Sequence, residues 1–210
     1  MIKRQRYFKK RKDRSLFVFE EFGSLFNSSI LDVGCYQAEL KKMIAEPNSY
    51  TGIDIVGCPD VYVNLEEIDC LPFEDQSFET VLCTEVLEHL GNFHLIMNDL
   101  FRVASKNVLI SLPNCWASAR KPIRSGKGTI AHYGLPFSNP VDRHKWFFSC
   151  NEAIEFFCNY ERSNPGVKSL KLLCVEKPRH KFVRLLRRLS TTNSAYLNKY
   201  VHTVFAHFVI

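Results

Sequence analysis

The sequence predicts an α/β fold built on a parallel sheet, and three features support that prediction. Ile30, Leu31 and Val33 form a short apolar run that is too brief for a helix and is typical of a buried strand. Gly34 follows at once and allows a sharp turn, after which residues 39–45 carry apolar side chains at helical spacing. A second strand is predicted at residues 50–53 and ends in Asp54.

Strand, glycine turn, helix, strand and acid in this order form the βαβ arrangement that binds a nucleoside. The turn and the helix N-terminus face the charged part of the ligand, and the terminal carboxylate binds the ribose hydroxyls. Asp54 is therefore the residue that the pattern assigns to a ribose. For Asp32 two interpretations stay open, a ligand contact and an acid that caps the glycine turn.

The other elements follow in chain order. Residues 16–26 are apolar and compatible with a helix until Gly23, and Ser149 with Glu152 three residues later is typical of a helix start. The remaining apolar runs predict strands at residues 61–63, 78–84, 107–112 and 167–175, and helices at residues 94–104 and 181–189.

Several segments together resemble the class I S-adenosylmethionine-dependent methyltransferases, in a form like methyltransferase type 11. Residues 31–38 (LDVGCYQA) correspond to the first motif of that family, and residues 71–90 (LPFEDQSFETVLCTEVLEHL) to its passage into and out of the fourth strand. Residues 100–103 (LFRV) and 108–114 (VLISLPN) resemble its next helix and fifth strand. The resemblance covers roughly residues 28 to 115.

The resemblance implies a Rossmann-like, doubly wound, mostly parallel sheet of seven strands flanked by helices, with residues 203–210 as an antiparallel last strand. It places the methyltransferase domain at residues 28–210, after a basic N-terminal helical arm at residues 1–27. Residues 115–147 hold many Gly and Pro and are expected to be an irregular insertion on the acceptor side. Residues 178–201 are expected to be a basic amphipathic helical segment.

The resemblance also implies a cofactor, S-adenosylmethionine, and a set of residues that bind it. Tyr36 and Ala38 stand where the family's first motif has its second and third glycines, so Tyr36 borders the expected site. Many relatives have Asp in place of Asn64. The expected cofactor-binding residues are Asp32, Gly34, Tyr36, Asp54, Ile55, Asn64, Leu65, Thr84 and Glu85.

Methyl transfer from a sulfonium requires alignment of donor and acceptor, and an oxygen nucleophile must also lose its proton. His144 is our first choice as general base, and His89 is expected to border the cofactor and the acceptor; His132 is a weaker candidate. Glu85, Glu88 and His89 are spaced to share one helical face, which together with His132 or His144 would suit a divalent metal. Because the same residues occur in relatives that use no metal, a metal-free site is expected.

Composition excludes some classes of protein. Apolar residues make up 46% and charged residues 24% of the 210-residue chain, as in soluble globular proteins. No apolar run has the length of a membrane-spanning helix, and the basic N-terminus lacks the pattern of a signal peptide. The eight cysteines are scattered singly, so we expect free thiols, no cysteine zinc site and a cytoplasmic protein.

The net charge of +6 is concentrated at the two ends of the chain. Residues 3–14 hold eight Lys or Arg and one acid, residues 177–188 hold six, and no acid follows Glu176. Such ends suit anionic lipid or nucleic acid, although solvated charged faces are equally consistent. Residues 181–189 have an apolar face and a basic face. The apolar face fits packing on the domain. Alternatively, residues 177–189 could make peripheral contact with the inner membrane surface.

These observations lead to one preferred function and two alternatives. We expect an S-adenosylmethionine-dependent methyltransferase that methylates a hydroxyl oxygen of a small, lipid-linked or saccharide-type acceptor. RNA methylation, with metal-assisted transfer to a 2′-hydroxyl as one form, is the second reading, although no RNA-binding module accompanies the basic ends. A non-catalytic binding or scaffold protein is the third, because Tyr36 and Ala38 replace glycines.

Overall fold

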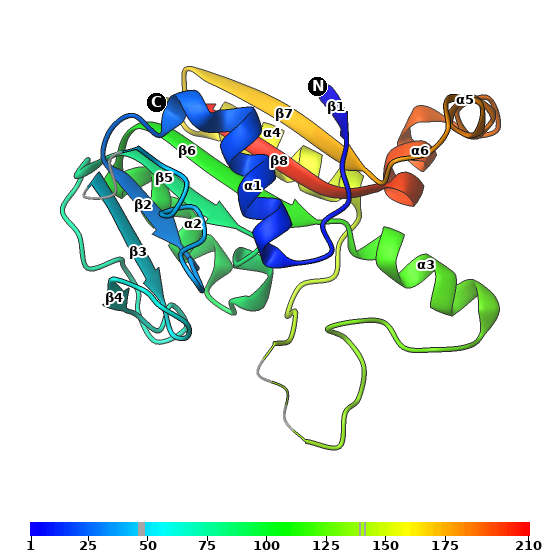
Figure 1. Cartoon of the computed structure of the whole chain (residues 1–210), viewed down its shortest axis with the longest axis horizontal. Helices are drawn as coiled ribbons and strands as arrows, with labels where there is room; N and C mark the ends of the chain where they lie inside the picture. Colours follow the sequence, from blue (N-terminus) through cyan, green and yellow to red (C-terminus); the bar gives the residue numbers. More distant parts are fainter. Residues whose placement is uncertain (46–48, 139, 141) are drawn as a thin grey trace.

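The chain folds around one mixed sheet of eight strands that carries helices on both faces (Figure 1). The computed structural model describes residues 1–45, 49–138, 140 and 142–210. Across the sheet the strands are β1 (Ile2–Gln5), β7 (Ser169–Glu176), β8 (Val201–Val209), β6 (Ala104–Pro113), β5 (Phe78–Thr84), β2 (Ile30–Val33), β3 (Tyr50–Asp54) and β4 (Val61–Tyr62).

Strand directions confirm the predicted fold class. All neighbouring pairs are parallel except those of β8, which runs antiparallel to both β6 and β7. The eighth strand is β1, which lies within the segment expected to be a helical arm. Its residues pair in parallel with residues 173–176 and so cover the edge of β7 that would otherwise leave backbone groups unpaired.

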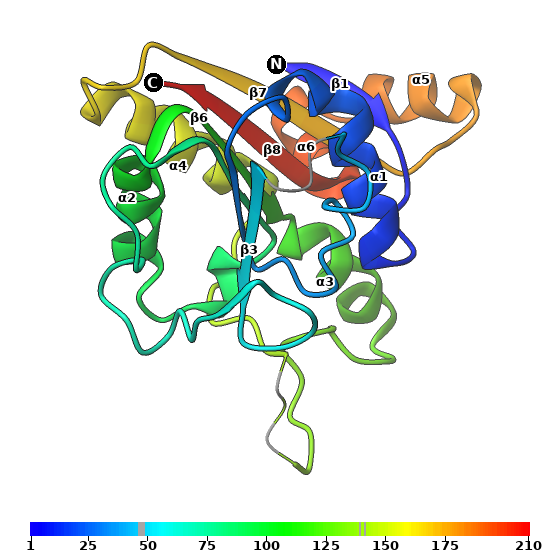
Figure 2. The ribbon, with the colours of Figure 1, turned by 60° about the vertical axis from the view of Figure 1, so that its left-hand side comes forward.

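Two apolar layers hold helices against the sheet. Helix α1 (Arg11–Phe22), followed by the short helix η1 (Gly23–Leu25), packs Phe17 and Val18 into a cluster on one face. Helices α2 (Phe93–Val103) and α4 (Cys150–Ser163) cover the opposite face (Figure 2). Complete burial of side chains such as Phe17 stabilises the fold by roughly 2–3 kcal/mol each, so α1 is fixed beside the sheet.

The crossover between β2 and β3 differs from the prediction. A helix was expected at residues 39–45, but the described part of this segment forms consecutive turns. Tyr36 and Ala38 have φ values of 50° and 47°, which a right-handed helix does not allow. Leu40 and Ile44 are nevertheless buried, so the apolar spacing predicted which side chains face the core but not the helix.

The segment expected to be irregular begins with a helix, α3 (Cys115–Ser125). Asn114 caps it: its side-chain oxygen accepts a hydrogen bond from the backbone of Ala117, while its amide nitrogen donates to the carbonyl of Val201 at 2.7 Å. Gly126, with φ of 62°, ends the helix in the left-handed region. From there to Ser149 the described residues form neither helix nor strand, as expected.

The C-terminal segment contains the predicted helix, α5 (Lys181–Leu189), and a second helix, α6 (Asn193–Tyr200). Packing of the apolar face of α5 on the domain was one expectation, and the structure contradicts it. No residue of α5 is buried, and the helix lies beside α6 at the margin of the molecule (Figures 1 and 2). Its apolar side chains are left exposed because the sheet is already covered on both faces by other helices.

Cysteine side chains are all free thiols, as expected. Cys35, Cys83, Cys115, Cys150 and Cys174 are buried, where they pack as small apolar groups. Among the described residues, no helix has both the length and the apolar character needed to cross a bilayer.

Helix α4 begins as predicted, in a reciprocal cap. Ser149 Oγ accepts a hydrogen bond from the Glu152 backbone at 3.2 Å, and Glu152 Oε2 accepts one from the Ser149 backbone at 2.8 Å. Replacing Ser149 with Ala removes one acceptor and is expected to lower the free energy of unfolding by about 1 kcal/mol. Urea denaturation measures the change, with Ser163→Ala at the exposed end of the same helix as the control; equal stability of both variants would contradict the cap's contribution.

Candidate active site

The turn after β2 requires glycine at its first position. Gly34 has φ of 80°, and a Cβ added there would lie 2.2 Å from Val86 Cγ2. Its backbone nitrogen donates to the carbonyl of Ile53 at 2.8 Å, so the turn lies against the end of β3. Any other residue at this position would be strained and would displace the segment that follows β5.

Tyr36 and Ala38 keep the left-handed backbone that glycine normally provides. Their φ values of 50° and 47° cost on the order of 1 kcal/mol each. The Tyr36 side chain is partly exposed, and the Arg11 guanidinium lies 4.4 Å from the centre of its ring. The bulky replacement therefore preserves the shape of the turn and brings the start of α1 over it.

Asp54 fastens the turn after β2 to the loop after β3. Its Oδ2 accepts a hydrogen bond from the Tyr36 backbone at 2.9 Å, and its Oδ1 accepts from the backbones of Ile55 and Val56 at 2.7 and 3.1 Å. The carboxylate thus lies at the carboxyl edge of the sheet, where the sequence predicted it. Ile55 is half exposed beside it.

Asp32 is buried and accepts a hydrogen bond from the Tyr50 hydroxyl at 2.6 Å. Burial, the largest influence, raises the pKa of Asp32 to about 6, although the bond from Tyr50 opposes the rise. The structure therefore joins Asp32 to the neighbouring strand β3. This contact differs from both interpretations that the sequence left open.

Two further expected cofactor residues follow β4. The side-chain oxygen of Asn64 accepts a hydrogen bond from the Glu66 backbone at 3.2 Å, which forms a local turn. Leu65 is buried, and its carbonyl accepts from the Asn92 side chain at 2.8 Å. Both residues are fixed by local contacts at the same edge of the sheet as Asp54.

The end of β5 is held by two distant parts of the chain. Thr84 is the last residue of β5, and Glu85 follows with φ of 52°, a strained value for a residue with a side chain. Arg14 of α1 donates to Glu85 Oε2 at 2.5 Å, and Thr203 of β8 donates to Glu85 Oε1 at 2.8 Å. Glu85 is therefore oriented by α1 on one side and β8 on the other.

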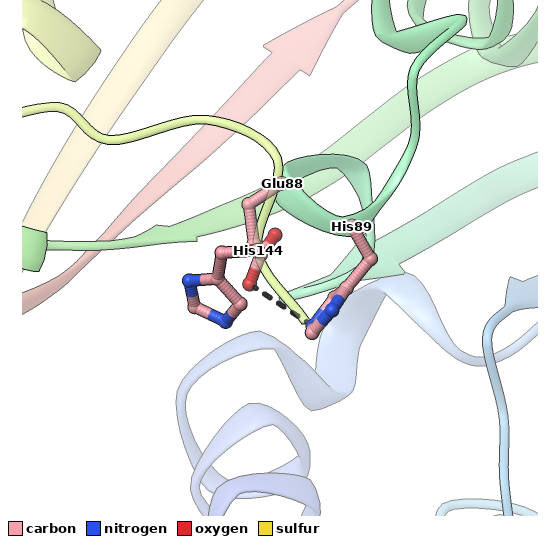
Figure 3. A group of neighbouring side chains, drawn as sticks. All are labelled: Glu88, His89 and His144. Carbon is pink, nitrogen blue, oxygen red and sulfur yellow. Dashed lines mark ion pairs between the residues drawn. The ribbon is translucent and has the colours of Figure 1, made fainter. Parts of the chain in front are cut away.

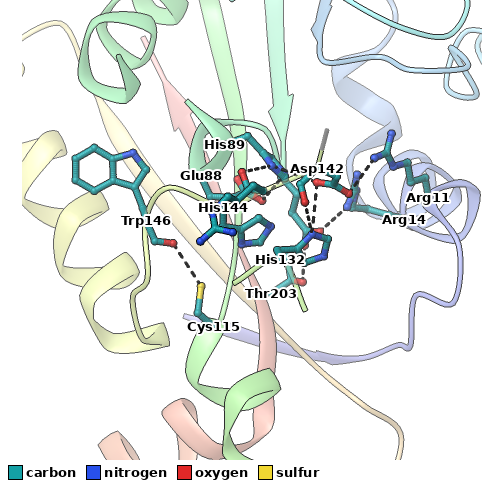
Figure 4. A network of polar contacts seen from close by, with 12 residues as sticks. Arg11, Arg14, Glu88, His89, Cys115, His132, Asp142, His144, Trp146 and Thr203 are labelled. Carbon is teal, nitrogen blue, oxygen red and sulfur yellow. Dashed lines mark hydrogen bonds and ion pairs between the residues drawn. The ribbon is translucent and has the colours of Figure 1, made fainter. Parts of the chain in front are cut away.

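A cavity of about 570 Å³ opens beyond the carboxyl ends of β5 and β6. Glu85, His89 and His144 line it, whereas the other eight expected site residues do not. The cavity therefore contains the predicted catalytic histidines but not the turn after β2. Figure 4 shows the polar side chains that meet in its wall.

Two histidines in this wall have one ring nitrogen fixed by hydrogen bonding. The short helix η3 (Leu87–His89) places His89 so that Nδ1 donates to the carbonyl of Arg143 at 3.1 Å. His144 Nδ1 lies 3.1 Å from the Tyr133 hydroxyl, whose one proton is donated to the carbonyl of Trp146. Both histidines therefore carry their proton on Nδ1 and leave Nε2 unprotonated.

Glu88 lies between these histidines and is completely buried. Neither of its carboxylate oxygens has a hydrogen-bond partner within the described part of the chain, and Oε1 lies 3.9 Å from His89 Nε2 (Figure 3). Burial raises the pKa of Glu88 well above its usual value and lowers that of His144 to about 3. The His144 ring is neutral and stacks on His132 with centroids 4.3 Å apart.

The cavity lining also contains a group of cations. Its basic side chains come from α3, from the segment after β7, and from α5 and α6. Among the described residues none of them forms an ion pair. They are Arg120, Lys121, Lys177, Arg179, Arg187 and Lys199.

Comparison with known proteins finds a methyltransferase match in part of the chain. Residues 31–112 match the family model described as a methyltransferase domain, a span that begins within β2 and ends within β6. The resemblance to class I methyltransferases seen in the sequence is therefore confirmed over this span. The predictions of a methyltransferase enzyme and of S-adenosylmethionine as its cofactor are thereby confirmed at the level of the family. None of the curated proteins matches the sequence.

Solved structures agree on the fold of this methyltransferase. A SAM-dependent methyltransferase from Archaeoglobus fulgidus is 12% identical, with a TM-score of 0.63 over 96% of this chain and 95% of that one. The plantazolicin methyltransferase BamL, solved with S-adenosylhomocysteine, is 15% identical, with a TM-score of 0.58 over 96% and 86%. The small RNA methyltransferase HEN1 is 17% identical, with a TM-score of 0.58 over 97% of this chain and 26% of that one.

Sequence reasoning missed several residues of the methyltransferase site. Arg11 and Arg14 belong to a basic run that was interpreted as a solvated arm or as a contact for anionic partners, and their reach into the site depends on the packing of α1. Tyr133 and Thr203 gave no signal, because isolated hydroxyl residues have no characteristic pattern. For the cations at residues 177–199, the sequence indicated a concentration of positive charge but not that they line the cavity.

Asp32 makes the stability of the methyltransferase depend on pH. Because its folded pKa is raised from 3.8 to about 6, its contribution is fully present below pH 3.8 and is lost as the pH rises through about 6. Relative to wild type, Asp32→Asn should therefore gain about 2 kcal/mol in free energy of unfolding between about pH 4 and pH 7. Urea denaturation across this range measures the difference, with Asp69→Asn at the surface as control; a pH-independent difference would contradict the assignment.

Proposed function

We propose that the enzyme methylates a hydroxyl oxygen of an acceptor that carries phosphate, with a small, lipid-linked or saccharide-type molecule as the preferred acceptor class. The observation that carries this proposal is the cavity, which is lined by both the Glu88–His89–His144 cluster and six cations without an ion pair among the described residues. Phosphate oxygens are the usual partners of clustered Lys and Arg. A neutral acceptor would leave these charges uncompensated.

The sheet order separates the two ends of the cavity. The cluster follows β5, next to the strands whose turns form the cofactor edge, whereas the cations belong to elements beyond β6. Arg120 and Arg187 lie over the Tyr200 ring, 5.1 and 4.3 Å from its centre, and so present their charges from two helices at one place. A phosphate bound there directs the rest of the acceptor toward the cofactor.

Methyl transfer at the cluster follows from this placement. The acceptor oxygen forms a bond to the methyl carbon, the carbon–sulfur bond breaks with its electron pair left on sulfur, and the hydroxyl proton passes to an imidazole. His144 remains the residue we assign to this proton, since its ring is neutral and has Nε2 unprotonated, and His89 borders the acceptor beside it. Asp54 and the turn after Gly34 would hold the cofactor's adenosyl group. Glu85 would fix the end of β5, which would lie beside the cofactor's sulfonium.

The exposed face of α5 supports a lipid-linked acceptor at a membrane surface. Phe182, Leu185, Leu186 and Leu189 are more than half exposed, and basic residues alternate with them along the helix. An apolar stripe flanked by Lys and Arg binds the interface of an anionic bilayer. Because Arg187 of the same helix lines the cavity, a membrane contact would bring the cavity close to lipid headgroups.

RNA is the second candidate acceptor. Its support is the group of cations in the cavity lining, together with a fold that is shared with the small RNA methyltransferase HEN1. RNA phosphates would occupy the same cations, and a terminal 2′-hydroxyl would lie at the cluster. The two candidates differ in the role of α5, since RNA binding does not require the exposed apolar residues of this helix.

Titration calorimetry with S-adenosylhomocysteine tests the cofactor site. The wild-type protein should bind, and Gly34→Ala should bind at least about tenfold more weakly, because the strained Cβ meets Val86 and moves the turn. Gly23→Ala is the matched control, since its added Cβ meets nothing within 4 Å. Circular dichroism checks that both variants fold. Absence of heat and of a thermal shift with wild-type protein at millimolar cofactor would favour a scaffold role.

Retention on vesicles and on RNA at physiological salt separates the two acceptors. With a lipid-linked acceptor, wild-type protein should cosediment with anionic phosphatidylglycerol vesicles, and Leu185→Glu with Leu186→Glu should abolish this by placing charge in the apolar stripe. Leu95→Glu on α2, also half exposed, is the control. Retention on single-stranded RNA that survives the α5 change but is lost on Arg120→Gln with Lys199→Gln would favour RNA instead.

A further inference from the structure

The Glu88 carboxylate is a buried charge-bearing group without a partner. Its side chain is 0% exposed, and neither oxygen has a hydrogen bond to a described residue. Burial of an unpaired carboxylate is costly, so native proteins pair such a group or use it to bind a cation. No Lys or Arg forms an ion pair with Glu88 among the residues that the structure describes.

Nearby basic side chains are already committed elsewhere. Arg14 pairs with Glu85 at 2.5 Å, and Lys145 pairs with Glu66 at 2.6 Å although its backbone nitrogen bonds the Glu88 carbonyl. The groups that do face the carboxylate are imidazoles. Ligand atoms of Glu88, His89 and His144 all lie within 4.8 Å of one another, and the three side chains are turned toward one point (Figure 3).

The hydrogen bonds around the histidines are those of metal ligands. A metal-binding imidazole usually donates its other N–H to a carbonyl or carboxylate, which fixes the ring and leaves a lone pair for the ion. His89 does so through Nδ1 to the carbonyl of Arg143, with Asp142 Oδ1 also at 3.3 Å. His144 Nδ1 is held by the Tyr133 hydroxyl, so Nε2 of each ring is available.

We propose that Glu88, His89 and His144 bind one divalent first-row transition-metal cation, in place of the metal-free site expected from the sequence. Two imidazole nitrogens and a carboxylate oxygen suit Mn²⁺, Fe²⁺, Co²⁺ or Zn²⁺ better than Mg²⁺ or Ca²⁺. Three protein ligands leave coordination positions open toward the cavity. Figure 4 shows His132 and Asp142 beside the three side chains.

The cation changes the roles of the cluster. A bound hydroxyl of the acceptor becomes more acidic on the cation, and its proton passes to His132, the stacked imidazole that is not a ligand. His89 and His144 then position the metal rather than accept the proton. This catalytic role rests on the proposed O-methylation, whereas binding of the cation does not.

Cobalt binding to the chelator-treated full chain tests the site without cofactor or acceptor. Titration with Co²⁺ should produce visible ligand-field absorption at one equivalent and raise the melting temperature. Glu88→Gln should weaken Co²⁺ binding more than about tenfold. Without the metal, the melting temperature of Glu88→Gln should be no lower than that of the wild type, because a neutral amide replaces a buried carboxyl of the same size. Glu67→Gln, an exposed acid on a nearby loop, should bind Co²⁺ like the wild type.

His144→Gln provides a second test if Glu88→Gln does not fold, and it too should lose the absorption bands. The proposal is overturned if wild-type protein gives neither bands nor heat at about 1 mM Co²⁺ or Mn²⁺, or if the folded variants retain wild-type affinity. Failure of methyl transfer with intact Co²⁺ binding would instead count against the proposed acceptor.

Discussion

The ion pair between Arg14 and Glu85 is the contact on which the organisation of the site depends. It joins α1 to the end of β5, and the bond from Thr203 extends the connection to β8. Both charged side chains are about one-fifth exposed, so the interaction is stronger than a pair in open solvent. The sheet order places β2, β5, β6 and β8 side by side, and this contact fixes the edge at which their loops meet.

Around that edge the molecule separates two kinds of chemistry. The turns after β2 and β3 are held together by the Asp54 carboxylate, which accepts hydrogen bonds from backbone N–H groups of both. The cavity beyond β5 and β6 is lined instead by carboxylates, imidazoles and unpaired cations. Arg11 touches both regions, since it lies over Tyr36 and forms a 3.7 Å ion pair with Asp142. Changes in either region therefore act on the same side chain.

Features that depend on neighbours in sequence were predictable. The strand ending in Asp54, the cap formed by Ser149 and Glu152, and the helix at residues 181–189 all follow from local spacing, and each is present. The prediction of a helix in the crossover was wrong. Just before that segment, Tyr36 and Ala38 adopt left-handed conformations, which the spacing of apolar residues does not reveal. Strand β1 was missed because its apolar content is low and its stability comes from pairing with β7, which is distant in sequence.

The site shows the same division. Residues at strand ends could be assigned from the pattern, because the carboxyl edge of a parallel sheet is a fixed place. The lack of an ion-pair partner for Glu88 could not be predicted from the sequence, because it results from Arg14 and Lys145 being paired with other acids.

The turn through Tyr36 and Ala38 affects how the loop binds a ligand. Residues with a Cβ sample fewer backbone states than glycine, so the loop is preorganised, and a ligand that fits it loses little conformational entropy on arrival.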